Sequence, residues 1–245
     1  MPAFNEVDSL PVALEKCKAL SDALGDVDLE VVVVDDGSTD STALMLEAAV
    51  STHTWLRVVS HPRTRGYGAA LRSGFDVASG EVVAYTDADN QFDVMEFAHH
   101  LHFMNEADLV AGFRVYRFDP FPRLLASWIY NRLVRLLFRA RVRDVDCSFK
   151  LMRRDLLDRL VLLSDDFFID TELVARARKW NWRIEEVGVR HYQRAAGRTT
   201  VRMSDIPRTL RRVGQMWWAI YYPNRARYSA HRDQQDATRK ELRGL

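Results

Sequence analysis

The sequence predicts an α/β protein with a mostly parallel β-sheet and helices flanking it. Short apolar runs that are typical of buried strands alternate with helical patterns through the first half of the chain. Acidic residues follow two of these runs directly, at 35–36 and at 87–89. With 245 residues, of which 47% are hydrophobic, the chain is long enough for one large domain with a substantial core.

The first half contains four predicted strands. The run Leu29–Val34 is continuous and β-branched, as a strand buried on both faces requires. The segment from Pro2 to Glu6 resembles a loop that follows a strand, yet only Met1 precedes it. We therefore expect a truncated first strand, through a start site placed too far downstream or through loss of the residues ahead of it. The other strands are predicted at 56–59, 82–86 and 109–112, and the helices at 9–24, 40–50, 67–78 and 93–104.

The second half is less regular. A helix is predicted over 122–138, another over 171–180, a strand over 183–189 and a last amphipathic helix over 205–221. Tryptophans and tyrosines crowd the end of that helix, and the polar residues after Pro223 are expected to be frayed. We divide the chain into a catalytic domain at 1–203, with halves at 1–112 and 113–203, then an amphipathic helix at 204–222 and a polar tail at 223–245.

The charges are unevenly distributed. Residues 1–110 hold 6 basic and 19 acidic side chains, a net charge of −13, and the remaining residues hold 29 and 15, a net charge of +14. Arginine, which suits bidentate contacts with phosphate, makes up nearly all of the basic excess. This pattern indicates cation binding in the first half and binding of an anion or a membrane surface in the second, unless each half only carries a solvated charged face.

Paired carboxylates occupy the end of the predicted strand at 82–86. Asp87 and Asp89 are one residue apart, and Gln91 follows two residues later. Carboxylate and amide oxygens are ligands for Mg²⁺ or Mn²⁺, and a nucleotide diphosphate completes the coordination of such an ion. A turn with helix-capping aspartates has the same composition, but the position after an apolar strand favours the metal site.

The second acidic cluster, Asp35-Asp36-Gly37-Ser38-Thr39-Asp40, also follows a buried strand. A plain turn with a capped helix explains the residues from Gly37 to Asp40. It does not explain two adjacent aspartates at a buried strand end, where an unpaired charge is costly. We therefore expect one of these carboxylates to accept hydrogen bonds from a base or a ribose.

Five motifs occur in order: Pro2-Ala3-Phe4-Asn5-Glu6, Asp35 to Asp40, Arg65-Gly66-Tyr67-Gly68, Asp87-Ala88-Asp89, and Arg194-Ala195-Ala196-Gly197-Arg198-Thr199. This set resembles the family-2 glycosyltransferases, most closely the branch of dolichol-phosphate mannose synthases and polyprenyl-phosphate glycosyltransferases. The resemblance covers about residues 2–202 and implies the GT-A fold, a Rossmann-like α/β architecture. The glycines at 66 and 68 would let a helix start close to the nucleotide.

The resemblance implies a role for individual residues. Pro2, Phe4, Glu6 and Asp36 would contact the nucleoside, and Asp87 would lie by the ribose and the diphosphate. Asp89 and Gln91 would hold the metal ion, Mg²⁺ or Mn²⁺. Arg114 would meet phosphate near the acceptor, and Arg194 and Arg198 would bind the diphosphate of the donor or the phosphate of the lipid. Asp89, Arg114 and Arg194 are the expected catalytic residues.

The implied reaction is inverting transfer of a sugar from a nucleoside-diphosphate sugar, such as GDP-mannose or a UDP-sugar, to a polyprenyl or dolichyl phosphate. A phosphate nucleophile is already anionic at neutral pH and needs no strong general base. Transfer to a hydroxyl of a polysaccharide or glycolipid would instead need Asp144, Asp146, or Asp170 with Glu172, as the base. Glu172 has either a structural role or a role in shaping the site. A metal-dependent nucleotidyltransferase is a further alternative.

The expected partners are a nucleotide sugar, a lipid phosphate and an anionic membrane surface, with no nucleic acid. The chain has no signal peptide and no run of 18 apolar residues, and Cys17 and Cys147 lack the spacing of a disulfide framework. These observations predict a cytoplasmic protein peripheral to the cytoplasmic face of the membrane, or one recruited by a separate membrane protein. The aromatic residues at 128 and 217–222 either pack in the core or dock at that surface.

Overall fold

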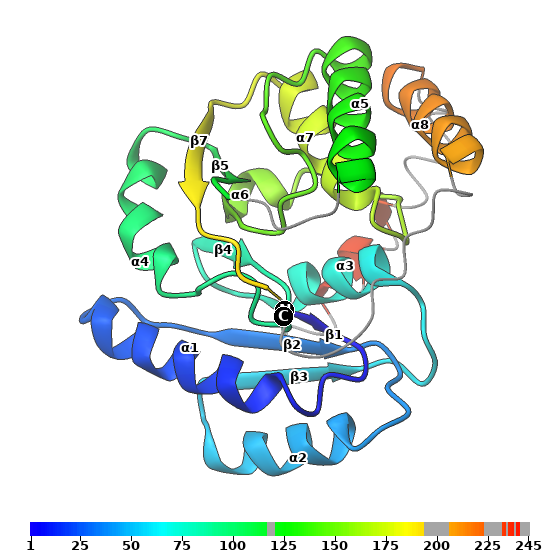
Figure 1. Cartoon of the computed structure of the whole chain (residues 1–245). Coiled ribbons are helices and arrows are strands. Elements are labelled where there is room, and N and C mark those ends of the chain that lie inside the picture. The colour runs from blue at the N-terminus through cyan, green and yellow to red at the C-terminus, as the bar shows by residue number, and fades with distance from the viewer. Residues whose placement is uncertain (117–120, 194–205, 223–231, 234, 238, 241–245) are drawn as a thin grey trace.

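The strands form two sheets, as the computed structural model of the chain shows (Figure 1). The structure describes residues 1–116, 121–193, 206–222, 232–233, 235–237 and 239–240. In the first sheet β1 (Pro2–Ala3), β2 (Val31–Asp35) and β3 (Leu56–Ser60) are parallel and lie in that order. All five residues of β2 are buried, which explains the unbroken run of apolar side chains.

The second sheet has the order β4-β6-β5-β7. It consists of β4 (Val82–Tyr85), β6 (Lys150–Arg153), β5 (Leu109–Arg114) and β7 (Ile184–Val189). The last two strands are parallel, whereas β6 runs antiparallel to both of its neighbours. The predicted α/β class with mostly parallel strands is confirmed. The sequence pattern missed β6, because a lysine opens this short strand.

The first strand has two residues. Pro2 pairs with Val34 and Ala3 with Asp35, so the segment that resembled a loop begins as a strand beside β2. A cavity of about 1200 Å³ lies between the two sheets, lined by Val32 and Val34 of β2 and by Val83 and Tyr85 of β4, among others. The two sheets face each other across this cavity, and among the described residues no strand of one sheet forms hydrogen-bonded pairs with a strand of the other.

Helices cover the sheets, and most begin and end within two residues of their predicted bounds. The segment predicted as one helix over 93–104 is instead a short α-helix, α4, continued by a 3₁₀ turn, η1. The helices α5, α7 and α8 pack against one another over the second sheet (Figure 1). The helical elements are α1 (Leu10–Leu24), α2 (Thr42–Thr52), α3 (Tyr67–Val77), α4 (Glu96–His100), η1 (Leu101–Asn105), α5 (Phe121–Phe138), α6 (Arg154–Leu157), α7 (Ile169–Lys179) and α8 (Ile206–Tyr221).

The amphipathic helix α8 is part of the main core. Val213 and Ile220 are buried together with Val134 and Phe138 of α5. The indole Nε1 of Trp217 donates a hydrogen bond to the carbonyl oxygen of Leu137 at 3.1 Å. One face of α8 therefore packs on the domain, while Trp218 on the other face is 61% exposed.

Two described residues of the C-terminal tail, Gln235 and Arg239, contact α3, whereas the sequence predicted a frayed tail. Arg239 is buried, and its Nε donates a hydrogen bond to Asp76 Oδ1 of α3 at 2.7 Å. Its Nη1 also donates to the carbonyl oxygen of Asp158 at 2.8 Å. The pattern of polar residues predicted exposure, but one long guanidinium side chain satisfies a buried carboxylate and fixes this part of the tail.

Replacing Arg239 by Ala is expected to lower the free energy of unfolding by about 3 kcal/mol, because it breaks a buried ion pair with Asp76 from one side. Chemical denaturation of the purified variant measures this loss. Arg232→Ala is the matched control, because Arg232 pairs with Asp236 at 3.9 Å on the surface of the same tail and should contribute under about 1 kcal/mol. Equal stabilities of the two variants would contradict the docking of the tail.

Candidate active site

The carboxyl ends of β1, β2 and β4 meet at one edge of the structure. The backbone amide of Asp36 donates a hydrogen bond to Ala3 O at 2.9 Å, which joins the ends of β1 and β2. The side-chain amide of Asn90 donates to Ser9 O at 2.8 Å, which ties the loop after β4 to the residues ahead of α1. Both predicted acidic clusters therefore lie at this edge, as expected for parallel strands.

Asp36 is buried and engaged within the chain. Its Oδ1 lies 2.6 Å from His61 Nδ1 and accepts the Arg65 amide at 2.9 Å, while its Oδ2 accepts the Gly66 amide at 2.8 Å. His61 Nε2 in turn lies 2.9 Å from the hydroxyl of Ser73. Asp36 thus holds the loop between β3 and α3 in place, and contact with a nucleoside stays a prediction for this residue.

The two glycines at the start of α3 have a packing role. A Cβ on Gly66 or Gly68 would collide with the backbone of residues 164–166. The Gly68 amide donates a hydrogen bond to Asp165 O at 2.9 Å across this contact. The glycines are therefore required for the loop before α7 to close against α3. Their role in starting a helix close to the nucleotide stays a prediction.

The segment after β1 is joined to the loop after β2. Asn5, in the left-handed conformation with a φ of 55°, accepts the amide of Thr39 at 2.8 Å. The Glu6 amide donates to the hydroxyl of Thr42 at 3.0 Å, and Glu6 Oε2 accepts the Ser9 hydroxyl at 2.8 Å. Pro2 lies within β1, and the ring of Phe4 is 46% exposed. Of these predicted nucleoside contacts, Phe4 offers an accessible surface.

Asp87 and Asp89 are two carboxylates after β4 that repel each other electrostatically. Burial, and then the charge of Asp89, raise the pKa of Asp87 to about 7. Asp87 Oδ2 accepts the hydroxyl of Ser148 at 2.6 Å, and the hydroxyl of Tyr67 also lies near this carboxylate and lowers its pKa. Oδ1 is enclosed and has no hydrogen-bond partner among the described residues. A buried carboxylate oxygen without a partner beside a second carboxylate is an arrangement that a cation would relieve.

Gln91 is oriented by the chain that follows β7. Its Nε2 donates a hydrogen bond to Tyr192 O at 3.1 Å, and the Tyr192 amide donates to Gln91 O at 2.8 Å. Since the amide nitrogen is used in this way, the side-chain oxygen is left as the atom that can bind a metal. Arg194 and Arg198 lie outside the described residues. The described part of the chain holds no group of three or more His, Cys, Asp or Glu side chains placed to bind a metal.

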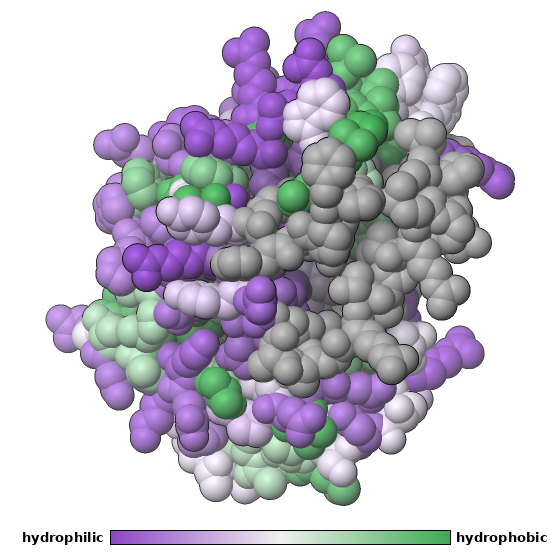
Figure 2. Space-filling model, in the orientation of Figure 1, coloured by the Kyte–Doolittle hydropathy of each residue, from purple (hydrophilic) through white to green (hydrophobic). Residues whose placement is uncertain are grey.

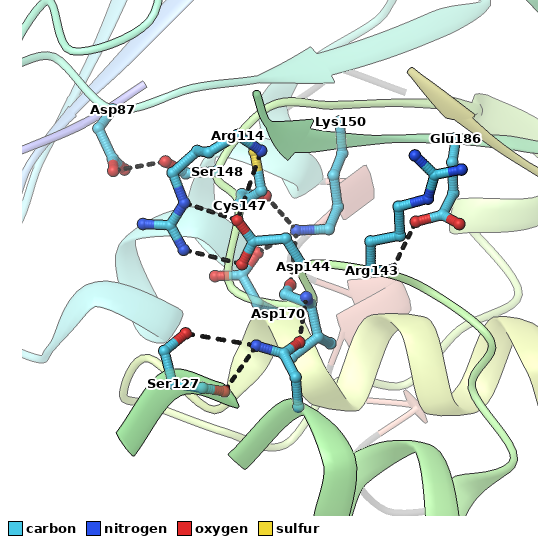
Figure 3. A network of polar contacts seen from close by, with 12 residues as sticks. Asp87, Arg114, Ser127, Arg143, Asp144, Cys147, Ser148, Lys150, Asp170 and Glu186 are labelled. Atoms are coloured by element: carbon cyan, nitrogen blue, oxygen red, sulfur yellow. Dashed lines mark hydrogen bonds and ion pairs between the residues drawn. The ribbon is translucent and has the colours of Figure 1, made fainter. Parts of the chain in front are cut away.

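Arg114, at the end of β5, forms a bidentate ion pair with Asp144 (Figure 3). Its Nε and Nη2 donate to the two carboxylate oxygens at 2.6 and 2.8 Å. Burial lowers the pKa of the guanidinium, but the hydrogen bonds to Asp144 outweigh burial and raise it overall. Arg114 is therefore a fixed, permanently charged group, and its Nη1 makes no hydrogen bond to a described residue.

A fully buried lysine supports this part of the site (Figure 3). Lys150 Nζ donates to Asp170 Oδ1 at 2.6 Å and to the carbonyl oxygens of Val145 and Cys147 at 3.1 and 2.5 Å. Asp170 also accepts the hydroxyl of Tyr85. Nothing in the sequence pattern assigned a role to Lys150, although a lysine at the start of an apolar run is a signal for a buried ion pair.

Asp144, Asp146, Asp170 and Glu172 are the four acidic side chains that the sequence offers as general bases. Among the described residues, three of them have a cationic partner and Asp146 has none. Asp144 binds Arg114 and Asp170 binds Lys150. Glu172 Oε1 accepts Arg176 Nε at 2.8 Å, and its Oε2 accepts the amides of Leu163 and Ser164, which gives it a structural role. Asp146 is half-buried, its Oδ1 is enclosed without a hydrogen-bond partner among the described residues, and burial raises its pKa to about 7.

This α/β fold is that of the GT-A glycosyltransferases. The family model "Glycosyl transferase family 2" matches residues 1–161, and the chain belongs to this family. Its structure is similar to that of glucosyl-3-phosphoglycerate synthase from Mycobacterium tuberculosis, solved with Mn²⁺ and uridine-diphosphate-glucose. The TM-score is 0.64 at 22% identity, over 89% of this chain and 76% of that chain, and shows the shared fold.

Two curated relatives act on polyprenyl phosphates by name. The chain is 32% identical over 199 residues to the undecaprenyl-phosphate 4-deoxy-4-formamido-L-arabinose transferase of Aeromonas hydrophila, covering 80% of this chain and 60% of the relative. It is 30% identical over 226 residues to the dodecaprenyl-phosphate galacturonate synthase of Rhizobium johnstonii, covering 91% of this chain and 65% of the relative. The chain thus matches less than two thirds of the length of either. Among the described helices, none combines the length and apolarity needed to cross a bilayer.

Proposed function

We propose that this protein transfers a sugar from a nucleoside-diphosphate sugar to a polyprenyl phosphate, with inversion at the anomeric carbon. The observation that carries the proposal is the hydrogen bond between Ser148 and Asp87, at 2.6 Å. It joins the carboxylates of the donor side to the segment that holds Arg114 through Asp144. One segment, which carries both Asp144 and Ser148, thus links the carboxylates of the donor side to Arg114. The names of the two curated relatives support a polyprenyl-phosphate acceptor.

The first half of the chain, residues 1–112, would bind the nucleotide sugar. Asp89 and the side-chain oxygen of Gln91 would hold Mg²⁺ or Mn²⁺, with Asp87 beside them. The enclosed, unpartnered Oδ1 of Asp87 fits such an ion. When bound, the ion would stabilise negative charge on the departing diphosphate. Pro2, Phe4, Glu6 and Asp36 would border the nucleoside, and Arg194 and Arg198 would add positive charge at the diphosphate or the acceptor.

The second half, residues 113–203, would bind the acceptor. Asp144 holds two nitrogens of Arg114 and so aims Nη1 at a fixed point. A guanidinium fixed in this way aligns an attacking phosphate without a cost of ordering at the moment of reaction. Because the phosphate is already anionic, the engagement of Asp144, Asp170 and Glu172 in structural contacts is compatible with the reaction.

A panel of nucleotide sugars, incubated with Mn²⁺ or Mg²⁺ and a short polyprenyl phosphate, tests the proposal by mass spectrometry. We expect a glycosyl-phosphate product that mild acid cleaves. Release of pyrophosphate would instead support a nucleotidyltransferase. Release of free sugar without dependence on the acceptor would support a hydrolase and contradict the proposal.

Transfer to a hydroxyl is the second candidate, and one observation favours it. Asp146 has a pKa raised to about 7 and no cationic partner bonded to it, which suits a general base at neutral pH. An acid-stable glycoside formed on a hydroxyl acceptor, with no product on polyprenyl phosphate, would establish this alternative.

A mixed apolar and basic face supports docking at the cytoplasmic face of an anionic membrane. Figure 2 shows hydrophobic side chains on the surface over α5, beside hydrophilic ones. We call this set the α5–α8 face; its exposed apolar members are Leu125, Trp128, Ile129, Leu136, Trp218 and Tyr222. Arg132 and Arg135 are exposed on the same helix, and Arg139 is exposed directly after its end. Aromatic and aliphatic side chains mixed with arginine are typical of helices at a lipid interface.

Docking by this face would bring the acceptor site close to the lipid. The buried side of α5 carries Asn131, whose side-chain oxygen accepts the amide of Val145 at 2.9 Å, and Tyr130, whose hydroxyl lies 2.7 Å from that of Thr171. One helix thus separates the exposed face from the segment that positions Arg114. A lipid phosphate would need to travel only a short way from the membrane to this arginine.

Replacing Leu136 by Glu is expected to weaken binding to vesicles of phosphatidylcholine and phosphatidylglycerol by about tenfold, through lost apolar burial and added repulsion. Co-sedimentation at low and high salt measures the effect. Leu44→Glu is the matched control, because Leu44 is 69% exposed and Leu136 77%. Leu44 lies on α2, at the opposite end of the molecule from α5 (Figure 1). Equal binding of the two variants would count against the α5–α8 face.

A further inference from the structure

Asp146 stands in a site where the other acidic groups are paired. Asp144 accepts two hydrogen bonds from Arg114, and Asp170 accepts one from Lys150. The Oδ1 of Asp146 is enclosed and makes no hydrogen bond to a described residue, while the residue as a whole is only half-buried. An enclosed polar oxygen without a partner, on a side chain that solvent reaches, marks a position where a ligand can bind.

The turn that carries Asp146 is fixed from both sides. Lys150 Nζ donates to the carbonyl oxygens of Val145 and Cys147, which flank Asp146 in the chain. On the opposite side the Val145 amide donates to Asn131 Oδ1 of α5 at 2.9 Å. Backbone movement to find another partner would break these contacts, two of which involve a fully buried ammonium group. The backbone that carries Asp146 is therefore held in place.

We propose that Asp146 binds the acceptor phosphate beside Arg114 and shares one proton with a phosphate oxygen. The proposal rests on the proposed function, since it takes the acceptor to be a phosphate. A carboxylate and a phosphate dianion repel each other, but a single proton held between their oxygens turns the contact into a short charge-assisted hydrogen bond. No covalent bond forms or breaks in this step, and the proton stays between the two oxygens.

The surroundings of Asp146 make this proton available near neutral pH. Burial first, and then the charges of Asp170 and Asp144, raise its pKa to about 7, while Arg114 and Lys150 act in the opposite direction. The groups that face it are Arg114 from β5, Lys150 from β6, Asp144 from its own segment, Asp170 from α7 and Tyr130 from α5. Since Arg114 and Lys150 are already paired with the other two carboxylates, neither neutralises Asp146 fully.

Binding of the acceptor would then take up a proton. At pH 8, one unit above the pKa of about 7, only about a tenth of Asp146 carries its proton, so binding weakens about tenfold relative to pH 6. Asp146→Asn places a hydrogen-bond donor at this position that does not titrate. We expect this variant to bind a short prenyl phosphate about tenfold more tightly than the wild type at pH 8 and equally well at pH 6.

Calorimetry with a short prenyl phosphate at pH 6 and pH 8 tests the proposal without requiring turnover. Asp146→Asn has no shared proton, so a pH dependence that is present in the wild type and absent in this variant belongs to the pair formed by Asp146 and the phosphate. Asp144→Asn is the matched control, and it should weaken binding at both pH values because it loosens Arg114. If binding of prenyl phosphate to Asp146→Asn depends on pH as it does in the wild type, the proposal is overturned. If Asp146→Asn loses kcat at every pH while it binds the acceptor as the wild type does, the proposal is also overturned, and Asp146 is a general base instead.

Stability gives a second readout. The pKa of Asp146 is about 7 in the folded chain and has its ordinary value near 4 in the unfolded chain. Between these values the folded chain binds more protons, so stability falls as pH rises through this window, and Asp146→Asn removes this part of the slope. The melting temperature of the variant should exceed that of the wild type at pH 8 by more than at pH 5. Binding of prenyl phosphate without any sugar transfer would count against the proposed function and leave the role of Asp146 intact.

Discussion

Replacing Asp89 by Asn is expected to lower kcat at saturating Mn²⁺ by a factor of about 100 to 1000, the largest loss that we predict for a single side chain. The substitution removes one of two neighbouring carboxylate charges while keeping the size of the side chain. The charge of Asp89 contributes to the raised pKa of Asp87, so the pair is held in a repulsive arrangement that a divalent ion would stabilise. Steady-state kinetics across a range of Mn²⁺ concentrations measures the loss.

The same variant has a readout that does not depend on turnover. Mn²⁺ with a nucleoside diphosphate should raise the melting temperature of the wild type, because ligands that bind only the folded chain stabilise it. Asp89→Asn should lose most of this increment. Asp93→Asn is the matched control, since Asp93 Oδ1 accepts the Met95 amide at 3.2 Å and an asparagine oxygen can do the same. Wild-type activity in excess chelator would refute the role of the metal.

The first half of the fold could be predicted well because its strands are buried and parallel. The apolar run of β2 and the helical pattern of α3 give strong local signals, and both elements appear within two residues of their predicted bounds. The strand β6 could not be predicted in this way, since it is antiparallel and opens with Lys150. Whether that lysine is buried depends on Asp170, which is 20 residues away on α7. Local patterns carry no information on such a pairing.

The sequence indicates which types of residue lie at the candidate site, but it does not indicate which partners they contact. The position of Asp87 and Asp89 follows from the rule that ligands bind at the carboxyl ends of strands. For Asp36, the same rule gives the place but not the partners, because both carboxylate oxygens are engaged by His61, Arg65 and Gly66. The pairing of Arg114 with Asp144 joins residues 30 apart and requires the fold. Arg194 and Arg198 stay predictions, as they lie outside the described residues.

Arg114→Lys is the second substitution with a large expected effect. We expect kcat/KM for the acceptor to fall about 100-fold, or about 2.7 kcal/mol of transition-state stabilisation, with little change in the affinity for the donor. Arg114 uses Nε and Nη2 to bind both oxygens of Asp144, which leaves Nη1 for the acceptor. An ammonium group is a point charge and cannot bind a carboxylate in this forked way while presenting a third donor in a fixed direction. Initial rates with varied acceptor and fixed donor measure the effect.

The lysine keeps the positive charge, so the buried Asp144 is not left without a cation and the variant should still fold. An Arg114→Ala variant would be less informative, because breaking a buried ion pair from one side costs about 3–5 kcal/mol of stability. Arg135→Lys is the matched control: Arg135 also uses Nε and Nη2, for the carbonyl oxygens of Val142 and Arg143 at 2.8 and 3.0 Å, but lies on the exposed side of α5. If both variants lose acceptor turnover equally, the arginine effect reflects support of the 142–148 segment, and Arg114 does not contact the phosphate. If only Arg114→Lys does, the forked pair with Asp144 is what aims the guanidinium at the acceptor.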